Sequence, residues 1–159
     1  MTTLGVVLIT AALLGGGGTA QGQAVLRDPA FEITMPPGVP VPTATRVADA
    51  AGVDYSTQTS TGVYRIQYAE MPSGDADKLF ESIRNNVKAG MTLTSHEPFT
   101  HQGHRGMRLF ITMPGLNQVM RMDCILVGQR LYRVWFIART TAELDTAPVR
   151  AFFGSLKIL

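Results

Sequence analysis

Apolar and polar residues alternate along three consecutive stretches between His104 and Arg139. The apolar positions are odd-numbered from 107 to 113 in the first stretch, and even-numbered from 120 to 126 and from 132 to 138 in the other two. Successive side chains of a β-strand point to opposite faces, so each stretch predicts a strand with one wholly apolar face. Pro-Gly at 114–115 and Gly-Gln at 128–129 have the composition of turns. The pattern predicts a three-stranded antiparallel meander against which the rest of the chain packs.

The opposite face of each predicted strand mixes arginines with apolar side chains. The strand predicted over 63–69 also carries an arginine, Arg65, on the face opposite to its inward apolar residues. If these strands are neighbours, six residues share one side of the sheet, and we expect them to bind a protein partner: Arg65, Arg108, Phe110, Arg121, Arg133 and Trp135. Arginine and tryptophan are enriched at the energetic centres of interfaces, and a basic patch favours an acidic or anionic partner surface. The alternative is structural, with a helix over the apolar members and the arginines in ion pairs at its rim.

The remaining segments predict further strands and two helices. Strands are expected over 30–35, about 50–59 and 91–99, in addition to 63–69. The longer helix spans 75–89, begins at a cap residue, Ser73 or Asp75, and ends before Gly90. The shorter helix runs near 146–154, with Pro148 in its first turn. The predicted fold class is therefore α+β, an antiparallel sheet of about six strands packed with two helices.

The two predicted helices differ in length, and this bears on the arginine-bearing face. We expect the longer helix to cover the methionine-rich apolar face of the meander, because its own apolar residues recur at helical spacing. The length of the shorter helix is less than the combined width of three or more strands, so this helix is expected to cover only part of the other face. Part of the predicted partner-binding surface should then stay open.

Residues 1–24 have the composition of a secretory signal peptide. An apolar run over 4–14 is followed by four glycines and by small residues up to Ala24. We expect cleavage after Ala24, with Ala20 as the alternative site; the lack of Lys or Arg before the run leaves an uncleaved anchor or a misassigned start open. The run is shorter than the roughly 20 residues that span a bilayer. The mature chain is then predicted to be one α+β domain over 25–159, periplasmic or secreted.

Composition limits the function classes and the compartments that fit the chain. The formal net charge of +2 does not by itself argue for nucleic-acid binding, and a hydrophobic fraction of 45% suits a packed domain. Cys124 is the only cysteine, so no intrachain disulfide forms. Because no cysteine follows the apolar run, a lipoprotein anchor is not indicated. The chain is expected to hold itself together by its core, without a cofactor.

Three histidines in one predicted hairpin are the main candidates for chemistry. His96, His101 and His104 lie within nine residues and suggest a metal site, a small-ligand site or a hydrolase as the alternative function. The competing interpretation is that they are solvated residues near a turn. Cys124 alternates with apolar neighbours, so it is expected to be buried and unreactive rather than a nucleophile. No nucleophile elbow, phosphate-binding glycine loop or H-E-x-x-H zinc motif occurs, and we predict a non-enzymatic protein.

Three short motifs together resemble the PsbP-like group of small exported proteins. They are F-x-I-x-M-P from Phe31 to Pro36, G-x-x-G at Gly103 and Gly106, and A-F-F-x-S-L-K-I from Ala151 to Ile158. The resemblance spans about residues 30–158. It implies an α/β/α sandwich around an antiparallel sheet, and an accessory, assembly or partner-binding role near membrane complexes. No functional residue of the group can be matched in this sequence, and a photosynthetic role does not follow.

Overall fold

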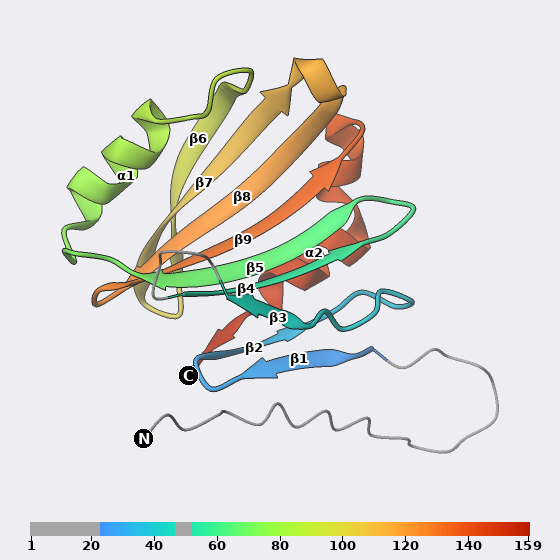
Figure 1. Ribbon diagram of the computed structural model, residues 1–159, viewed down its shortest axis with the longest axis horizontal. Coiled ribbons are helices and arrows are strands. Elements are labelled where there is room, and N and C mark those ends of the chain that lie inside the picture. The colour runs from blue at the N-terminus through green and yellow to red at the C-terminus, as the bar shows by residue number, and fades with distance from the viewer. Residues whose placement is uncertain (1–22, 47–51) are drawn as a thin grey trace.

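A seven-stranded antiparallel sheet forms the centre of the computed structural model, which describes residues 23–46 and 52–159 (Figure 1). The predicted signal peptide therefore lies almost wholly outside the described residues. The strands of the sheet lie in the order β3-β4-β5-β9-β8-β7-β6. Their bounds are Ala44–Arg46 (β3), Gly52–Gln58 (β4), Val63–Glu70 (β5), Thr92–His101 (β6), His104–Met113 (β7), Gln118–Val127 (β8) and Arg130–Ala138 (β9).

The predicted meander is confirmed as β7, β8 and β9, which are adjacent and antiparallel. The apolar faces of β7 and β8 are largely buried on one side of the sheet, with Leu109 and Cys124 fully inaccessible, whereas the apolar face of β9 is buried on the other side. A short 3-10 helix, Pro114–Leu116, makes the β7–β8 connection, and a two-residue turn joins β8 to β9. The alternation of apolar residues therefore predicted the positions of these strands and the burial of the apolar face of each one, but not the side of the sheet on which β9 buries it.

Helix α1 (Ala76–Asn85) covers the methionine-rich face, as predicted. The Asp75 carboxylate caps its start by accepting a hydrogen bond from the backbone N–H of Lys78. The helix ends at Asn85, short of the predicted Ala89, where the Asn86 side-chain amide donates to the Ser82 carbonyl. Asparagine competes with the backbone for hydrogen bonds and so favours helix ends. Phe80 is the one buried residue of α1.

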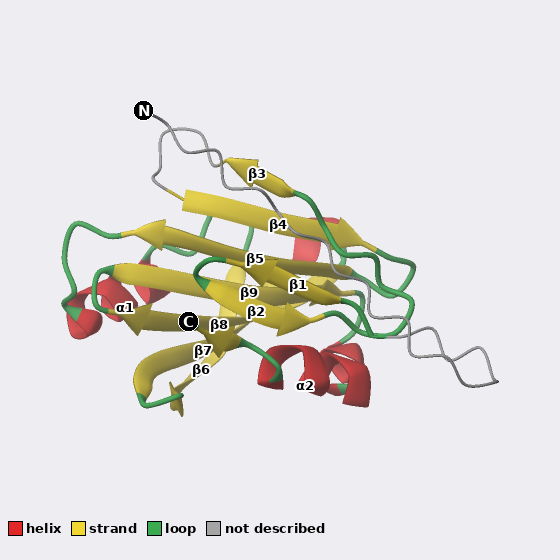
Figure 2. Ribbon diagram, turned by 90° about the horizontal axis from the view of Figure 1, so that it is seen from below, coloured by secondary structure: helices red, strands yellow, loops and turns green. Residues whose placement is uncertain are grey.

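The opposite face is covered more completely than the sequence predicted (Figure 2). Helix α2 (Ala147–Gly154) follows a 3-10 helix, Thr141–Asp145, and packs on this face through Val149, Phe152 and Phe153. Beside it lies a second, three-stranded antiparallel sheet that joins the two ends of the described chain, in the order β1-β2-β10. Its strands are Val25–Asp28 (β1), Phe31–Thr34 (β2) and Lys157–Ile158 (β10).

The observed architecture is thus the predicted α+β sandwich, with seven strands rather than about six in the main sheet and a small second sheet. One hydrophobic core lies between the main sheet and α1, and the larger one lies between the main sheet, α2 and the small sheet. None of the helices in the described part of the chain is long and apolar enough to cross a membrane.

Strand β6 forms one edge of the main sheet, and β3 forms the other. β6 is ten residues long, whereas β3 is three. The pairing of β6 with β7 is irregular between Leu93 and Ser95, and Pro98 lies near the middle of the strand, opposite Met107. Proline has no N–H to donate to a ladder, and it is therefore confined to edge strands or bulges.

Candidate functional site

The six residues predicted to share one side of the sheet lie on both sides, so that part of the prediction is wrong. The register pairs Arg65 with Trp135, and Arg133 with Cys124, which places these side chains on the α1 side. It pairs Arg121 with both Phe110 and Phe136, which places Arg121 and Phe110 on the α2 side. The division is therefore three and three: Arg65, Arg133 and Trp135 on the α1 side, and Arg108, Phe110 and Arg121 on the α2 side.

The two-residue turn between β8 and β9 explains the error. It pairs Val127 with Arg130. Directly opposite residues of an antiparallel pair share a face, so the odd-numbered positions of β9 face the same side as the even-numbered positions of β8. The arginine-bearing face of β9 is consequently the apolar face of β8. Alternation within one strand does not determine which face of the next strand it joins.

On the α2 side, the two arginines take part in a buried ion-pair network around Asp123. Both Arg108 and Arg121 donate two hydrogen bonds to this carboxylate, at 2.8 and 2.9 Å from Arg108 and at 3.2 and 3.0 Å from Arg121. The Arg121 guanidinium also lies 3.9 Å from the centre of the Phe153 ring in α2. Its neighbour Arg108 reaches out to Glu97 at 2.8 Å, and hydrogen bonding to Asp123 raises the pKa of Arg108.

This network corresponds to the structural alternative predicted from the sequence. Arg121 and Asp123 are 8% and 5% exposed, so neither offers its charge to a partner. The Arg121 guanidinium instead connects β8 to Phe153 of α2, and the Arg108 guanidinium connects β7 to β8 and to Glu97 of β6. Arg108 and Arg121 are therefore assigned to the architecture of the fold rather than to a binding surface.

On the α1 side, four partly buried side chains and the buried Trp135 lie next to one another on the sheet, three of them in the same hydrophobic cluster as the apolar residues of the helix. Arg65 makes a bidentate ion pair with Asp54, at 2.7 and 2.5 Å, and its guanidinium stacks 4.6 Å from the centre of the Trp135 ring. The Arg133 side chain differs: its Nε is buried and has no hydrogen-bond partner among the described residues. We call this surface the Arg133 strip, and it consists of Arg65, Met122, Arg133, Trp135 and Ile137.

The residues of the Arg133 strip are contiguous in the sheet. Met122 is directly opposite Trp135, and Ile137 is the next residue of β9 on the same face. Met122, Arg133 and Ile137 are all of intermediate burial. No ion pair joins Arg133 to a carboxylate within residues 23–46 and 52–159. The strip therefore combines apolar area with one uncompensated positive charge.

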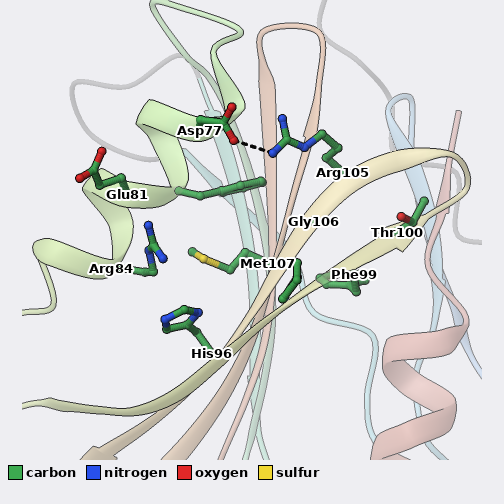
Figure 3. A pocket seen from close by; sticks show the side chains of 11 residues that line it. Asp77, Glu81, Arg84, His96, Phe99, Thr100, Arg105, Gly106 and Met107 are labelled. Atoms are coloured by element: carbon green, nitrogen blue, oxygen red, sulfur yellow. Dashed lines mark hydrogen bonds and ion pairs between the residues drawn. The ribbon is translucent and has the colours of Figure 1, made fainter.

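A cleft of about 770 Å³ lies between α1 and the β6–β7 hairpin (Figure 3). Phe80, Pro98 and Met107 contribute its apolar lining. Arg105 of β7 closes one side by an ion pair of 2.6 Å with Asp77 of α1. The sequence did not indicate this cleft, because the cleft depends on how closely α1 packs against the sheet.

The three histidines do not converge, which removes the predicted alternative that used them together. His96 is directly opposite Leu109 and lines the cleft on the α1 side. His101 is opposite His104 on the other face, and its Nε2 lies 2.9 Å from the Leu156 carbonyl oxygen. Residues five apart on a regular strand face opposite sides. No group of three or more His, Cys, Asp or Glu side chains within the described residues is arranged to hold a metal ion.

Cys124 is buried, as predicted. Its side chain is 0% exposed, and burial raises the pKa of the thiol from its ordinary value of 9.0 to about 12, although the positive charge of Arg133 acts in the opposite direction. The thiolate is the nucleophilic form of cysteine. At neutral pH this residue is therefore protonated and enclosed; that it resists thiol reagents in the folded protein stays a prediction.

Comparison with known proteins gives a structural likeness but no sequence match. No protein-family model matches the chain. The search of curated proteins likewise gives no match. Two structures of limited similarity are a protein of unknown function, described as a putative regulator, from Pseudomonas aeruginosa (TM-score 0.42, 13% identity, 77% of this chain and 85% of that one) and a protein from Bacteroides thetaiotaomicron (TM-score 0.47, 12% identity, 87% and 49%).

The solution structure of cyanobacterial PsbP from Synechocystis sp. PCC 6803 is more similar. The TM-score is 0.59 at 14% sequence identity, and the match covers 93% of this chain and 98% of that one. At this identity the likeness concerns the fold. It agrees with the resemblance found in the three sequence motifs: the chain has a PsbP-like α+β fold.

Proposed function

We propose that the protein is an exported, non-catalytic accessory module that binds a protein partner through the Arg133 strip. The observation that carries the proposal is the Arg133 guanidinium, whose Nε is buried without a hydrogen-bond partner among the described residues. Its neighbours on the surface are the partly buried Met122 and Ile137 and the 7% exposed Trp135. An unsatisfied buried donor costs free energy in the isolated protein. The terminal nitrogens of the same guanidinium are not among its buried atoms, so a partner's carboxylate can pair with them and compensate the charge.

The chemistry of the strip favours a carboxylate on the partner. A guanidinium and a carboxylate form two parallel hydrogen bonds, which fixes the orientation of the partner as well as adding binding energy. The adjoining Met122 and Ile137 supply partly exposed apolar area around this charge, and Trp135 packs in the core beside them; apolar contacts around a charged centre are typical of the residues that dominate binding energy in interfaces. The neighbouring Arg65 is neutralised by Asp54, so Arg133 is the residue proposed to meet the partner's charge.

Export and an accessory role rest on the sequence and on the fold. The signal-peptide composition of residues 1–24 supports transport to the periplasm or beyond. The PsbP-like resemblance implies accessory or assembly roles beside membrane complexes, and a membrane complex or another anionic protein surface is accordingly the proposed partner. Fold alone does not determine function, so the proposal depends on the test of the strip itself.

The test compares two variants that each remove one arginine of the same region. Arg133→Gln removes the proposed contact, whereas Arg139→Gln removes the same charge from an exposed position just after β9. Tagged proteins are used to recover partners from the native cell envelope, and the recovered proteins are identified and quantified by mass spectrometry. We expect one partner to be enriched equally by the unchanged protein and by Arg139→Gln.

For Arg133→Gln we expect recovery of that partner to fall about tenfold, which corresponds to about 1.4 kcal/mol of binding free energy. The loss should be larger at low salt, because charge attraction between surfaces is screened by added ions. Thermal unfolding of both variants serves as the control for folding. Equal recovery by the three proteins would reject the strip as the binding surface, and the absence of any specifically enriched protein would reject the proposed function.

A further inference from the structure

We propose that the cleft beneath α1 binds a small amphiphilic carboxylate, that is, an organic acid with an aliphatic or aromatic tail. This proposal is independent of the protein-binding function assigned to the Arg133 strip. The two sites use different side chains of the same face of the sheet, and none of the five strip residues lines the cleft.

The size and floor of the cleft suit the tail of such a ligand. A volume of about 770 Å³ falls within the range of small-molecule sites, about 300–1,000 Å³. Phe80 and Met107 of the lining belong to the apolar core on this side of the sheet. Methionine adapts its shape to irregular apolar ligands. The floor therefore offers apolar contacts to a flexible or flat hydrocarbon group.

The cationic side chains of the cleft explain why the ligand should carry a carboxylate. Arg105 is already paired with Asp77. In contrast, Arg84 of α1 lines the cleft with its Nε buried and without a hydrogen-bond partner among the described residues. The terminal nitrogens of Arg84 are not among its buried atoms and form no hydrogen bond or ion pair among the described residues. A carboxylate in the cleft can therefore pair with them in the bidentate geometry that a guanidinium favours.

Two further titratable groups face the same space. His96 lines the cleft from β6, and Figure 3 shows its ring and the Arg84 side chain turned into the space between helix and strand. An imidazole N–H can donate a second hydrogen bond to the ligand. Glu81 also belongs to the lining, but it is exposed and forms no ion pair with Arg84 within the described residues. The positive charge of Arg84 is thus left for the ligand.

The limited packing of α1 against the sheet allows a ligand to enter the cleft. Phe80 is the only buried residue of the helix, and the remaining residues of its apolar stripe, among them Leu79 and Ile83, are only partly buried. A helix held at one point can move away from the sheet at a lower cost than one embedded along its length. The cleft is therefore accessible from solvent without disturbing the β-sheet.

The experiment titrates the isotope-labelled protein with sodium octanoate and follows its amide resonances by NMR. Acetate tests the carboxylate without the tail, and 1-octanol tests the tail without the carboxylate. We expect octanoate to shift resonances of α1, β6 and β7 in a saturable manner. Acetate and 1-octanol should bind at least tenfold more weakly.

Two variants test the assigned role of Arg84. Arg84→Gln should weaken octanoate binding at least tenfold, whereas Lys78→Gln, which removes an equal charge from an exposed position of the same helix, should leave it unchanged. Arg84→Lys keeps the charge but loses the planar fork, so it should bind with intermediate affinity and provides a second readout if Arg84→Gln fails to fold. Saturable shifts elsewhere, no saturable shift, or octanoate binding that survives both Arg84 substitutions would each overturn the proposal.

Discussion

The Asp123 carboxylate accepts hydrogen bonds from two arginines on neighbouring strands, and it is almost completely buried. Two guanidinium groups around one carboxylate leave a net positive charge, which is partly offset by Glu97 at the outer end and by the Phe153 ring at the inner end. A buried charge is tolerated only when it is paired and hydrogen-bonded. The stability of this region should therefore depend on Asp123 more than on either arginine.

Asp123→Asn keeps the shape of the side chain and removes its charge. We expect the free energy of unfolding, measured by urea denaturation, to fall by about 3–5 kcal/mol, because the buried Arg121 is left without a counter-ion. Asp54→Asn is the matched control, since Asp54 also makes a bidentate pair but with the Arg65 side chain, which is 36% exposed. That change should cost no more than about 1 kcal/mol. Equal losses in the two variants would show that burial does not distinguish the pairs.

At the scale of single residues, the sequence predicts burial well but does not predict which residues share a face of the sheet. The burial of Cys124 followed directly from alternation within one strand. The placement of Arg121 and Arg133 on opposite faces of the sheet could not be predicted in the same way. It depends on the register that a two-residue turn imposes on the next strand. The role of Asp123 in the ion-pair network was not predicted for a related reason. A single acidic residue on a mixed face does not indicate an ion pair until the neighbouring strand is known.

Among the helices and strands, α1 is the element with the weakest attachment. Its apolar stripe was predicted from helical periodicity, but the helix ends at Asn85 and only Phe80 is buried. Helices of this length are marginal in water by themselves and depend on tertiary packing. The Phe80 side chain should therefore be the main attachment of α1 to the sheet.

Phe80→Ala should release α1 while leaving the meander folded. We expect amide hydrogen exchange within Ala76–Asn85 to increase strongly, whereas β7, β8 and β9 remain protected, because local unfolding affects the least stable cooperative unit first. The matched control is Phe153→Ala in α2, which should increase exchange in α2 but not in α1. Uniform loss of protection throughout the protein in Phe80→Ala would contradict a weakly attached helix.

The small sheet shows which elements sequence patterns miss. β1 and β10 are four and two residues long, too short for two-residue alternation to be recognised. β1 pairs with the β2 strand that directly follows it, whereas β10 pairs with β2 across almost the whole length of the described chain, so the partner of β10 could not be inferred from neighbouring sequence. The longer β4–β9 segments, in contrast, pair with sequence neighbours in most cases and were predicted close to their observed bounds.

The two faces of the whole molecule are covered unequally, and this asymmetry decides where binding is proposed. On the α2 side, a helix and a second sheet enclose the core, and the arginines there are used in the Asp123 network. On the α1 side a single short helix leaves both the cleft and the Arg133 strip accessible. The open arginine surface expected from the sequence therefore stays a prediction, and we now assign it to the α1 face in place of the α2 face.

We predict that Pro98 in the edge strand β6 keeps the molecule from associating with other copies through that edge. Because Pro98 lies opposite Met107 in the ladder yet has no N–H, its nitrogen must point outward from the sheet. A strand from another molecule that approached β6 would find no donor at this position. Pro98→Thr should restore the donor and cause concentration-dependent self-association, measured by sedimentation velocity. Pro37→Thr, in an exposed loop, is the control, and a monomeric Pro98→Thr at high concentration would contradict the role of the proline.

Pro98 also bears on the stoichiometry of any complex that the protein forms. One edge of the main sheet is interrupted at its middle, and the other, β3, is only three residues long. Repeated addition of strands, by which many β-proteins polymerise, is therefore blocked at both ends. A molecule whose contacts are confined to one face terminates an assembly instead of extending it, so we expect complexes of one copy per binding site and no filaments.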